Sequence, residues 1–152
     1  MFTEKTIALV ERAKGRAYSL ARERVDLESV LAAVGADAEA GVRLADCLTG
    51  GDISVLRGRC PEIGVAASAP VKMEPDDDLR QILETGLDLA SGEGVPDRTH
   101  PGFIALEHLV CGVAMSRAAV EMLGGGLAPL AREEALNLLT SWMDDHPAYQ
   151  VL

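Results

Sequence analysis

The segment Gly102–Ala114 is apolar on nearly every side, and it limits the possible folds more than any other part of the chain. Its larger residues recur at the i, i+3, i+4 and i+7 spacing of a helix, namely Leu106, Leu109, Val110 and Val113. Most other positions are small or apolar as well, so the helix has no face suited to water. The sequence therefore predicts a central helix that other elements enclose.

A weaker copy of this segment occurs earlier in the chain. Leu27-Glu28 precedes an apolar run as Leu106-Glu107 does, at an offset of 79 residues. A second match, Cys47–Gly50 with Met122–Gly125, has an offset of 75 residues. Two matches at similar offsets indicate an internal repeat.

Capping residues and apolar spacing predict four helices in each half. Good N-caps precede several of the apolar runs, and glycine or proline follows them. The predicted helices begin at Thr3, Asp26, Asp37, Asp52, Asp76, Gly102, Ser116 and about Leu127, and they end near Ala21, Val34, Leu48, Arg59, Ala90, Ala114, Leu123 and Met143.

The same spacing predicts which helix faces are buried. Phe2 is placed to contact Ile7 as a hydrophobic staple, and Arg16 is expected on a solvated basic face. Val42 and Leu87 are expected on the buried faces of their helices. The first helix is expected to bury Ile7, Val10, Ala13, Ala17, Leu20 and Ala21.

The predicted fold is all-α, an eight-helix bundle made of two pseudo-symmetric four-helix repeats. Repeat 1 covers about 2–60, repeat 2 covers about 76–143, and residues 61–75 form a linker rich in Pro, Gly and Ala. Residues 144–152 form a tail. Neither half buries enough area alone, so we expect one domain over residues 1–152.

The charge of the chain is uneven and acidic, with a net value of −10. Residues 1–70 hold 10 acidic and 9 basic residues, whereas residues 71–152 hold 14 and 5. This balance argues against nucleic acid as a partner, because phosphate contacts need a basic face. The acidic excess suits a partner that has a basic patch or exposed apolar groups. The other interpretation is that the acidic residues only keep the surface soluble. No window resembles a signal peptide or membrane span, so we expect no membrane partner and a cytoplasmic location.

The residues that carry chemistry do not form a recognisable catalytic, cofactor or metal motif. Cys47, Cys60 and Cys111 have no metal-ligand spacing with histidine, and buried thiols are expected in the helices. Glu107 and His108 are consecutive, so their side chains point about 100° apart on a helix. A structural or capping role for His108 is therefore favoured over catalysis, and an enzyme would need a deep polar pocket near this pair.

Three segments resemble the Clp N-terminal domain, the double-repeat module at the front of Clp-type chaperone ATPases. They are Phe2–Lys5, the Glu-His-Leu segment Phe103–Val113, and Val120–Gly124, within a likeness that spans residues 2–143. The resemblance implies a module that recognises adaptors or unfolded proteins and performs no chemistry itself. The ATPase is not part of this chain, because none of its three lysines lies in a Gly-x-x-x-x-Gly-Lys motif.

The resemblance also implies a candidate binding site at Glu28 and Glu107. In some family members the two repeat glutamates hold the guanidinium of phosphorylated arginine, and a carboxylate suits that group through bidentate pairing. Leu27 and Leu106 stand here where the family has threonine. The other interpretation is that both glutamates are first-turn residues favoured by the helix dipole.

The expected function is therefore protein binding through an apolar groove or exposed helix face, by a monomer or weak dimer. The alternative is a regulatory or structural helical module that self-associates or sequesters an unrelated partner.

Overall fold

The computed structural model describes residues 2–64, 72–91 and 103–145, which contain eight helices and no strand. The all-α class is confirmed, and no helix of the described part is long and apolar enough to cross a membrane. Gly102, linker residues 65–71 and tail residues 146–152 lie outside the described residues. The helices are α1 (Glu4–Ser19), α2 (Leu27–Ala36), α3 (Ala38–Leu48), α4 (Ile53–Arg59), α5 (Asp77–Ser91), α6 (Leu106–Met115), α7 (Arg117–Leu123) and α8 (Arg132–Asp145).

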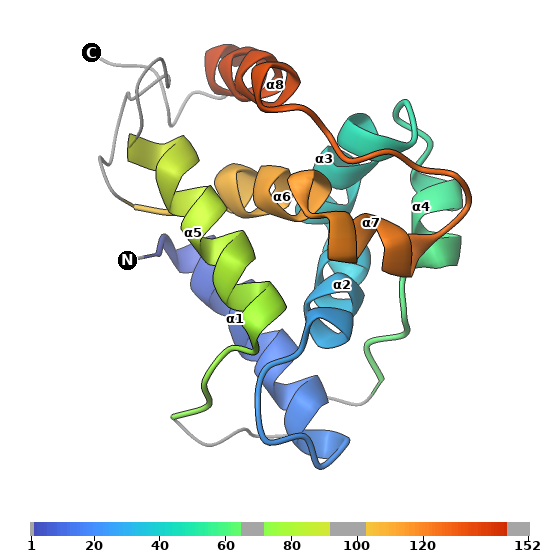
Figure 1. Cartoon of the computed structure of the whole chain (residues 1–152), viewed down its shortest axis with the longest axis vertical. Helices are drawn as coiled ribbons and strands as arrows, with labels where there is room; N and C mark the ends of the chain where they lie inside the picture. Colours follow the sequence, from blue (N-terminus) through green and yellow to red (C-terminus); the bar gives the residue numbers. More distant parts are fainter. Residues whose placement is uncertain (1, 65–71, 92–102, 146–152) are drawn as a thin grey trace.

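Helix α6 crosses the middle of the molecule (Figure 1). It packs against α5, α3, α7, α8 and α1, which together enclose it. Every residue from Ile104 to Ala114 is buried. The prediction of an enclosed central helix is confirmed, but its predicted start at Gly102 is wrong. Helix α6 begins at Leu106, because Ala105 is an extended N-cap residue and Ile104 pairs with Phe2 instead of joining the helix.

Side-chain caps start five of the helices at the predicted residues, and one of them is Asp76 ahead of α5, which accepts from the Leu79 N–H (2.8 Å). Asp26 accepts from the Ser29 N–H (3.2 Å), Asp37 from Ala40 (2.8 Å), Asp52 from Val55 (3.1 Å) and Ser116 from Ala119 (3.2 Å). Each bond satisfies a backbone donor that the first helical turn leaves without a partner. Thr3 also occupies a cap position, but its hydroxyl contacts the Thr6 hydroxyl (3.0 Å) instead of a backbone N–H.

The predicted buried face of α1 is confirmed for Ala13 and Ala17 but is wrong for Ile7 and Leu20. Ile7 and Leu20 are 47% and 48% exposed, whereas Leu9 and Arg16 are buried together with Ala13 and Ala17. Both faces carry apolar residues at helical spacing, and packing against α2 selects the one with Leu9. The backbone of Phe2 pairs with that of Ile104 ahead of α6.

Three other expectations about the helices are also corrected. Val42 and Leu87 are 47% and 43% exposed, because the neighbouring helices pack on adjacent faces of α3 and α5. Helix α2 continues past Val34 to Ala36.

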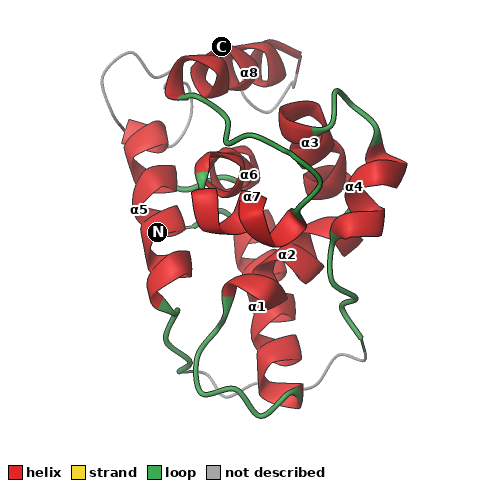
Figure 2. Cartoon of the chain, turned by 45° about the vertical axis from the view of Figure 1, so that its right-hand side comes forward, coloured by secondary structure: helices red, strands yellow, loops and turns green. Residues whose placement is uncertain are grey.

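Helix α8 begins at Arg132 rather than near Leu127, and a loop crosses the molecule ahead of it (Figure 2). Pro129 within this loop disfavours a helical residue before it. The Leu130 N–H then donates to the Ala114 oxygen near the end of α6 (2.8 Å). The loop therefore satisfies a carbonyl that the last turn of α6 leaves without a helical partner.

Candidate functional site

Glu28 lies in the first turn of α2 and is already bound to two arginines of its own chain. The Arg16 Nη2 of α1 is 2.9 Å from Glu28 Oε1, and Arg22 Nη2 is 3.5 Å from both carboxylate oxygens. The Glu28 side chain is 39% exposed, so solvent still reaches it. This candidate site residue therefore does bind guanidinium groups, but those groups are intramolecular.

Arg16 is the anchor of this cluster and is not the solvated residue that we predicted. Its side chain is only 10% exposed. It also donates to the Glu62 backbone oxygen (2.8 Å) and to the Ser29 hydroxyl (3.1 Å). Ser29 in turn donates to Asp26, which pairs with Arg22. The spacing of charges along α1 carries no signal for this role, because all partners lie in later segments.

The arginine contacts set the ionisation of Glu28. The hydrogen bond from Arg16 is the largest cause that lowers the pKa of Glu28 below its usual value. Partial burial opposes it, and the nearby charges of Arg22 and Arg16 lower the pKa further. The carboxylate is therefore ionised at neutral pH.

Glu107 lies in the first turn of α6 and is only 2% exposed. Its charge contributes to the raised pKa of Lys5, although the hydrogen bond from Lys5 to Glu39 (2.8 Å) is the larger cause. Lys5 and Arg16 are separated by three turns of α1, about 16 Å along the axis. Glu28 and Glu107 therefore lie toward opposite ends of α1, and each belongs to its own surroundings.

His108 caps α6, as its position predicted. Its Nδ1 accepts the backbone N–H of Ala105 (3.0 Å), which is the N-cap residue of α6. The side chain is 6% exposed. Through this bond, one ring nitrogen of His108 caps the start of the central helix.

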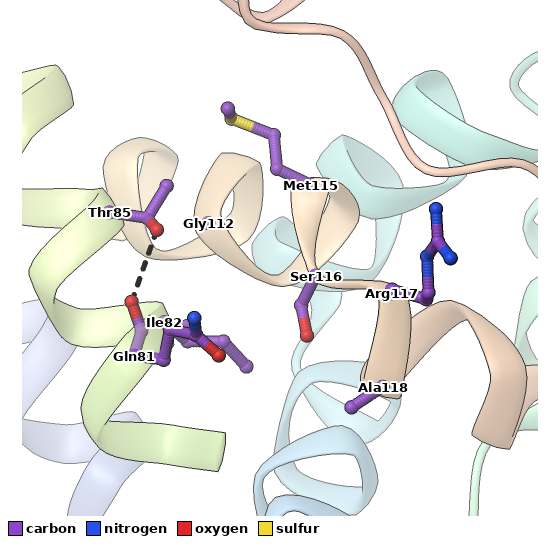
Figure 3. A pocket seen from close by; sticks show the side chains of 8 residues that line it. All are labelled: Gln81, Ile82, Thr85, Gly112, Met115, Ser116, Arg117 and Ala118. Atoms are coloured by element: carbon purple, nitrogen blue, oxygen red, sulfur yellow. Dashed lines mark hydrogen bonds between the residues drawn. The ribbon is translucent and has the colours of Figure 1, made fainter. Parts of the chain in front are cut away.

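A hollow of about 220 Å³ opens between α5, the end of α6 and the start of α7 (Figure 3). Buried Ile82 and Gly112 line it together with half-buried Met115. On α5, the same helix as Ile82, the Thr85 hydroxyl donates to the Gln81 backbone oxygen (3.1 Å). The hollow is smaller than typical small-molecule sites of about 300–1,000 Å³, and the polar residues Gln81, Ser116 and Arg117 line it beside the apolar ones.

Two more open hollows flank the segment that follows α4, with volumes of about 440 and 400 Å³. Ile63 and Glu62 line both of them, while Arg16 lines the smaller one. Sequence reasoning expected an apolar groove without naming its residues. Gly112 and Gly35 line two of these hollows, but they mark close packing rather than open space, because a Cβ would lie 2.9 Å from the Ile82 oxygen at Gly112 and 2.6 Å from the Cys60 Cβ at Gly35.

No three His, Cys, Asp or Glu side chains lie close enough to hold a metal ion in residues 2–64, 72–91 and 103–145. The candidate site therefore consists of ion pairs and hollows, and Glu28 is the more exposed of the two predicted glutamates, Glu28 and Glu107. No protein-family model and no curated protein matches this chain.

Proposed function

We propose that this chain is a protein-binding module of the Clp N-terminal type, which recognises adaptors or unfolded segments and performs no chemistry of its own. The observation that carries the proposal is a reciprocal pattern of contacts between the two halves. In this proposal the halves are two four-helix repeats related by a pseudo-twofold axis, within one cytoplasmic domain.

The reciprocal pattern appears first in the segments that precede the helices. Phe2, before α1, pairs with Ile104, before α6. Val25, before α2, pairs in the same parallel sense with Pro75, before α5. Exchanging α1 with α5 and α2 with α6 converts one pairing into the other, which supports a pseudo-twofold relation.

Helix packing follows the same exchange. Helix α3 packs on α6 as α7 packs on α2, and α1 contacts α6 as α5 contacts α2. Leu27-Glu28 and Leu106-Glu107 begin α2 and α6 at corresponding positions. These correspondences support the repeat that the sequence offsets predicted.

Binding in this proposal uses the hollow between α5, α6 and α7. An apolar side chain of the partner would contact Ile82 and Met115, and burial of apolar surface would provide most of the affinity. The acidic groups of the second half would orient a basic partner, so affinity should fall as salt rises.

The test is a pull-down from source-organism lysate at low and moderate salt, with the full chain as bait and mass spectrometry as readout. We expect a Clp ATPase, an adaptor or a Clp client in the retained fraction, and its loss with Met115→Glu. Val55→Glu, on exposed α4, is the matched control and should retain it. Recovery of the bait alone, or of one unrelated protein, would contradict the proposal and favour the self-associating alternative.

Glu28 and Glu107 remain the proposed guanidinium-binding residues of this module. Of the two, Glu28 is better placed, because a substrate guanidinium could replace the more distant Arg22 while Arg16 stays bound. The Glu28→Ala, Glu107→Ala double variant should lose binding of a phosphoarginine peptide. Unchanged binding, with a folded variant by circular dichroism, would refute this assignment.

A further inference from the structure

Arg22 follows the end of α1 and places its guanidinium between two carboxylates at the start of α2. Its Nη1 atom donates to Asp26, and its Nη2 atom lies 3.5 Å from both carboxylate oxygens of Glu28. The planar fork of a guanidinium suits two acceptors at once. Asp26 and Glu28 therefore form a guanidinium site, and a residue of the same chain occupies it.

Both carboxylates of the guanidinium site are also held by contacts that do not involve Arg22. Asp26 accepts the Ser29 backbone N–H (3.2 Å) and the Ser29 hydroxyl (2.7 Å), as the N-cap of α2. Glu28 accepts from Arg16 (2.9 Å), whose side chain is only 10% exposed. The site would therefore keep its shape without Arg22, and a pre-formed site costs less free energy to fill.

Arg22 can leave the guanidinium site by rotation of its side chain alone. Its backbone N–H donates to the Ala17 oxygen (2.9 Å), and Ala21 before it turns the chain with a φ of +58°. These backbone contacts end α1 without help from the guanidinium. The Arg22 side chain is 34% exposed, so solvent and ligands reach it. Partly exposed ion pairs contribute little to stability, and a ligand can therefore compete with Arg22.

The charges of the cluster favour one kind of guanidinium ligand. Two carboxylates and two arginines make up the cluster, so their formal charges cancel. When Arg22 leaves the site, one negative charge is in excess, and the cation of an arginine side chain balances it. Phosphorylation of that arginine would add negative charge beside the two carboxylates, which repel it. The charge balance therefore favours an unmodified arginine.

We propose that Asp26 and Glu28 bind an unmodified arginine side chain of a partner protein, and that Arg22 blocks this site as an internal substitute until the partner displaces it. This role of Arg22 rests on the proposed function, in which Glu28 binds guanidinium groups. It adds Asp26 as a second ligand and an autoinhibitory contact. The apparent affinity for the partner is lowered in proportion to the fraction of molecules in which Arg22 has left the site.

The experiment is an NMR titration of the full chain with N-acetyl-arginine amide, followed through the backbone amide signals of the first turn of α2. Arg22→Gln should bind the compound about three- to fivefold more tightly than wild type. Arg22→Lys keeps the charge but not the planar fork, so its affinity should lie between these two. Arg24→Gln is the matched control, because Arg24 is 56% exposed and its partner is Asp77 (3.8 Å) rather than the guanidinium site. It should change the affinity by less than about twofold.

Equal or weaker binding by Arg22→Gln than by wild type would overturn the autoinhibitory role, and Arg22→Lys gives the same comparison if Arg22→Gln folds poorly. N-acetyl-phosphoarginine amide should bind more weakly than the unmodified compound. The reverse order would overturn the choice of ligand but would leave Glu28 as a guanidinium-binding residue. If neither compound binds to any variant, the guanidinium-binding role of Glu28 fails together with the role of Arg22. The pull-down with Met115→Glu tests the protein-binding module separately.

Discussion

Arg16 shows how much one residue contributes to this fold. Its guanidinium connects α1 to the start of α2 through Glu28 and Ser29, and to the chain after α4 through the Glu62 oxygen. A buried charge is costly unless it is paired and hydrogen-bonded, and here all three nitrogens of the group have partners. The residue therefore stabilises the junction of three segments that are distant in sequence.

Replacing Arg16 with Ala should destabilise the protein by about 2–4 kcal/mol, because Glu28, Ser29 and the Glu62 oxygen lose their donor. Urea unfolding followed by circular dichroism measures the effect. Arg12→Ala is the matched control on the exposed side of α1 and should change the free energy of unfolding by less than about 0.5 kcal/mol. Equal effects of the two substitutions would contradict the structural role of Arg16.

Glu28 should make the stability depend on pH in the acid range. The pKa of Glu28 is lower in the folded chain than the usual 4.5. The ionised Glu28 therefore contributes its full share to the free energy of unfolding above pH 4.5, and this share is lost as the pH falls through the pKa of the folded chain. Glu28→Gln should therefore cost up to about 1 kcal/mol at pH 7. The difference from wild type should vanish well below pH 4.5.

Urea unfolding at a series of pH values tests this expectation, with the exposed Glu23→Gln as a control for net charge. A difference between wild type and Glu28→Gln that grows on acidification would show that the arginine contacts do not set the ionisation of Glu28.

At the scale of elements, the close approach of α5 to α6 depends on Gly112. A Cβ at this position would lie 2.9 Å from the Ile82 backbone oxygen and 3.3 Å from its Cγ2 atom. Backbone cannot move aside as a flexible side chain can, so the two helices would have to separate.

Gly112→Ala should therefore destabilise the protein by about 1–3 kcal/mol despite the higher helix propensity of alanine. Gly58→Ala in α4 is the matched control, because a Cβ there meets open space. It should stabilise the protein by about 0.5–1 kcal/mol through propensity alone. Chemical denaturation of both variants gives the comparison, and a stabilised Gly112→Ala protein would contradict the close packing of α5 on α6.

At the scale of the whole molecule, α8 belongs to the same core as the other helices. Leu139 and Trp142 are buried in the common core, and the Trp142 ring centre lies 5.0 Å from the Arg43 guanidinium carbon of α3. This cation–π contact joins the last helix to the first half of the chain.

The fluorescence of Trp142, the single tryptophan, should therefore change at the same urea concentration as the far-ultraviolet circular dichroism signal. Arg43→Ala should lower both midpoints together, at a cost of about 0.5–1 kcal/mol. If the fluorescence changed at a lower urea concentration than the circular dichroism signal, α8 would separate before the other helices unfold. That result would contradict the prediction that the molecule unfolds as one cooperative unit.

The sequence was most informative where the deciding interactions are local. Asp26, Asp37, Asp52 and Ser116 cap helices through bonds to residues two or three positions away, and such bonds can be read from short segments. The candidate glutamates were also placed correctly in the first turns of helices. Their surroundings were not predictable, because Arg16 of α1 hydrogen-bonds to Glu28 and the charge of Lys5, also on α1, interacts with Glu107.

The sequence by itself determined that this chain is helical and that the segment before Ala114 is enclosed, because hydrogen bonding and apolar spacing act within each helix. Only the tertiary structure decided that α1 buries Leu9 and Arg16 rather than Ile7, since both faces have helical spacing. It also decided that α8 begins after the Leu130 bond to Ala114. Both outcomes depend on contacts between residues far apart in the chain, which local patterns do not encode.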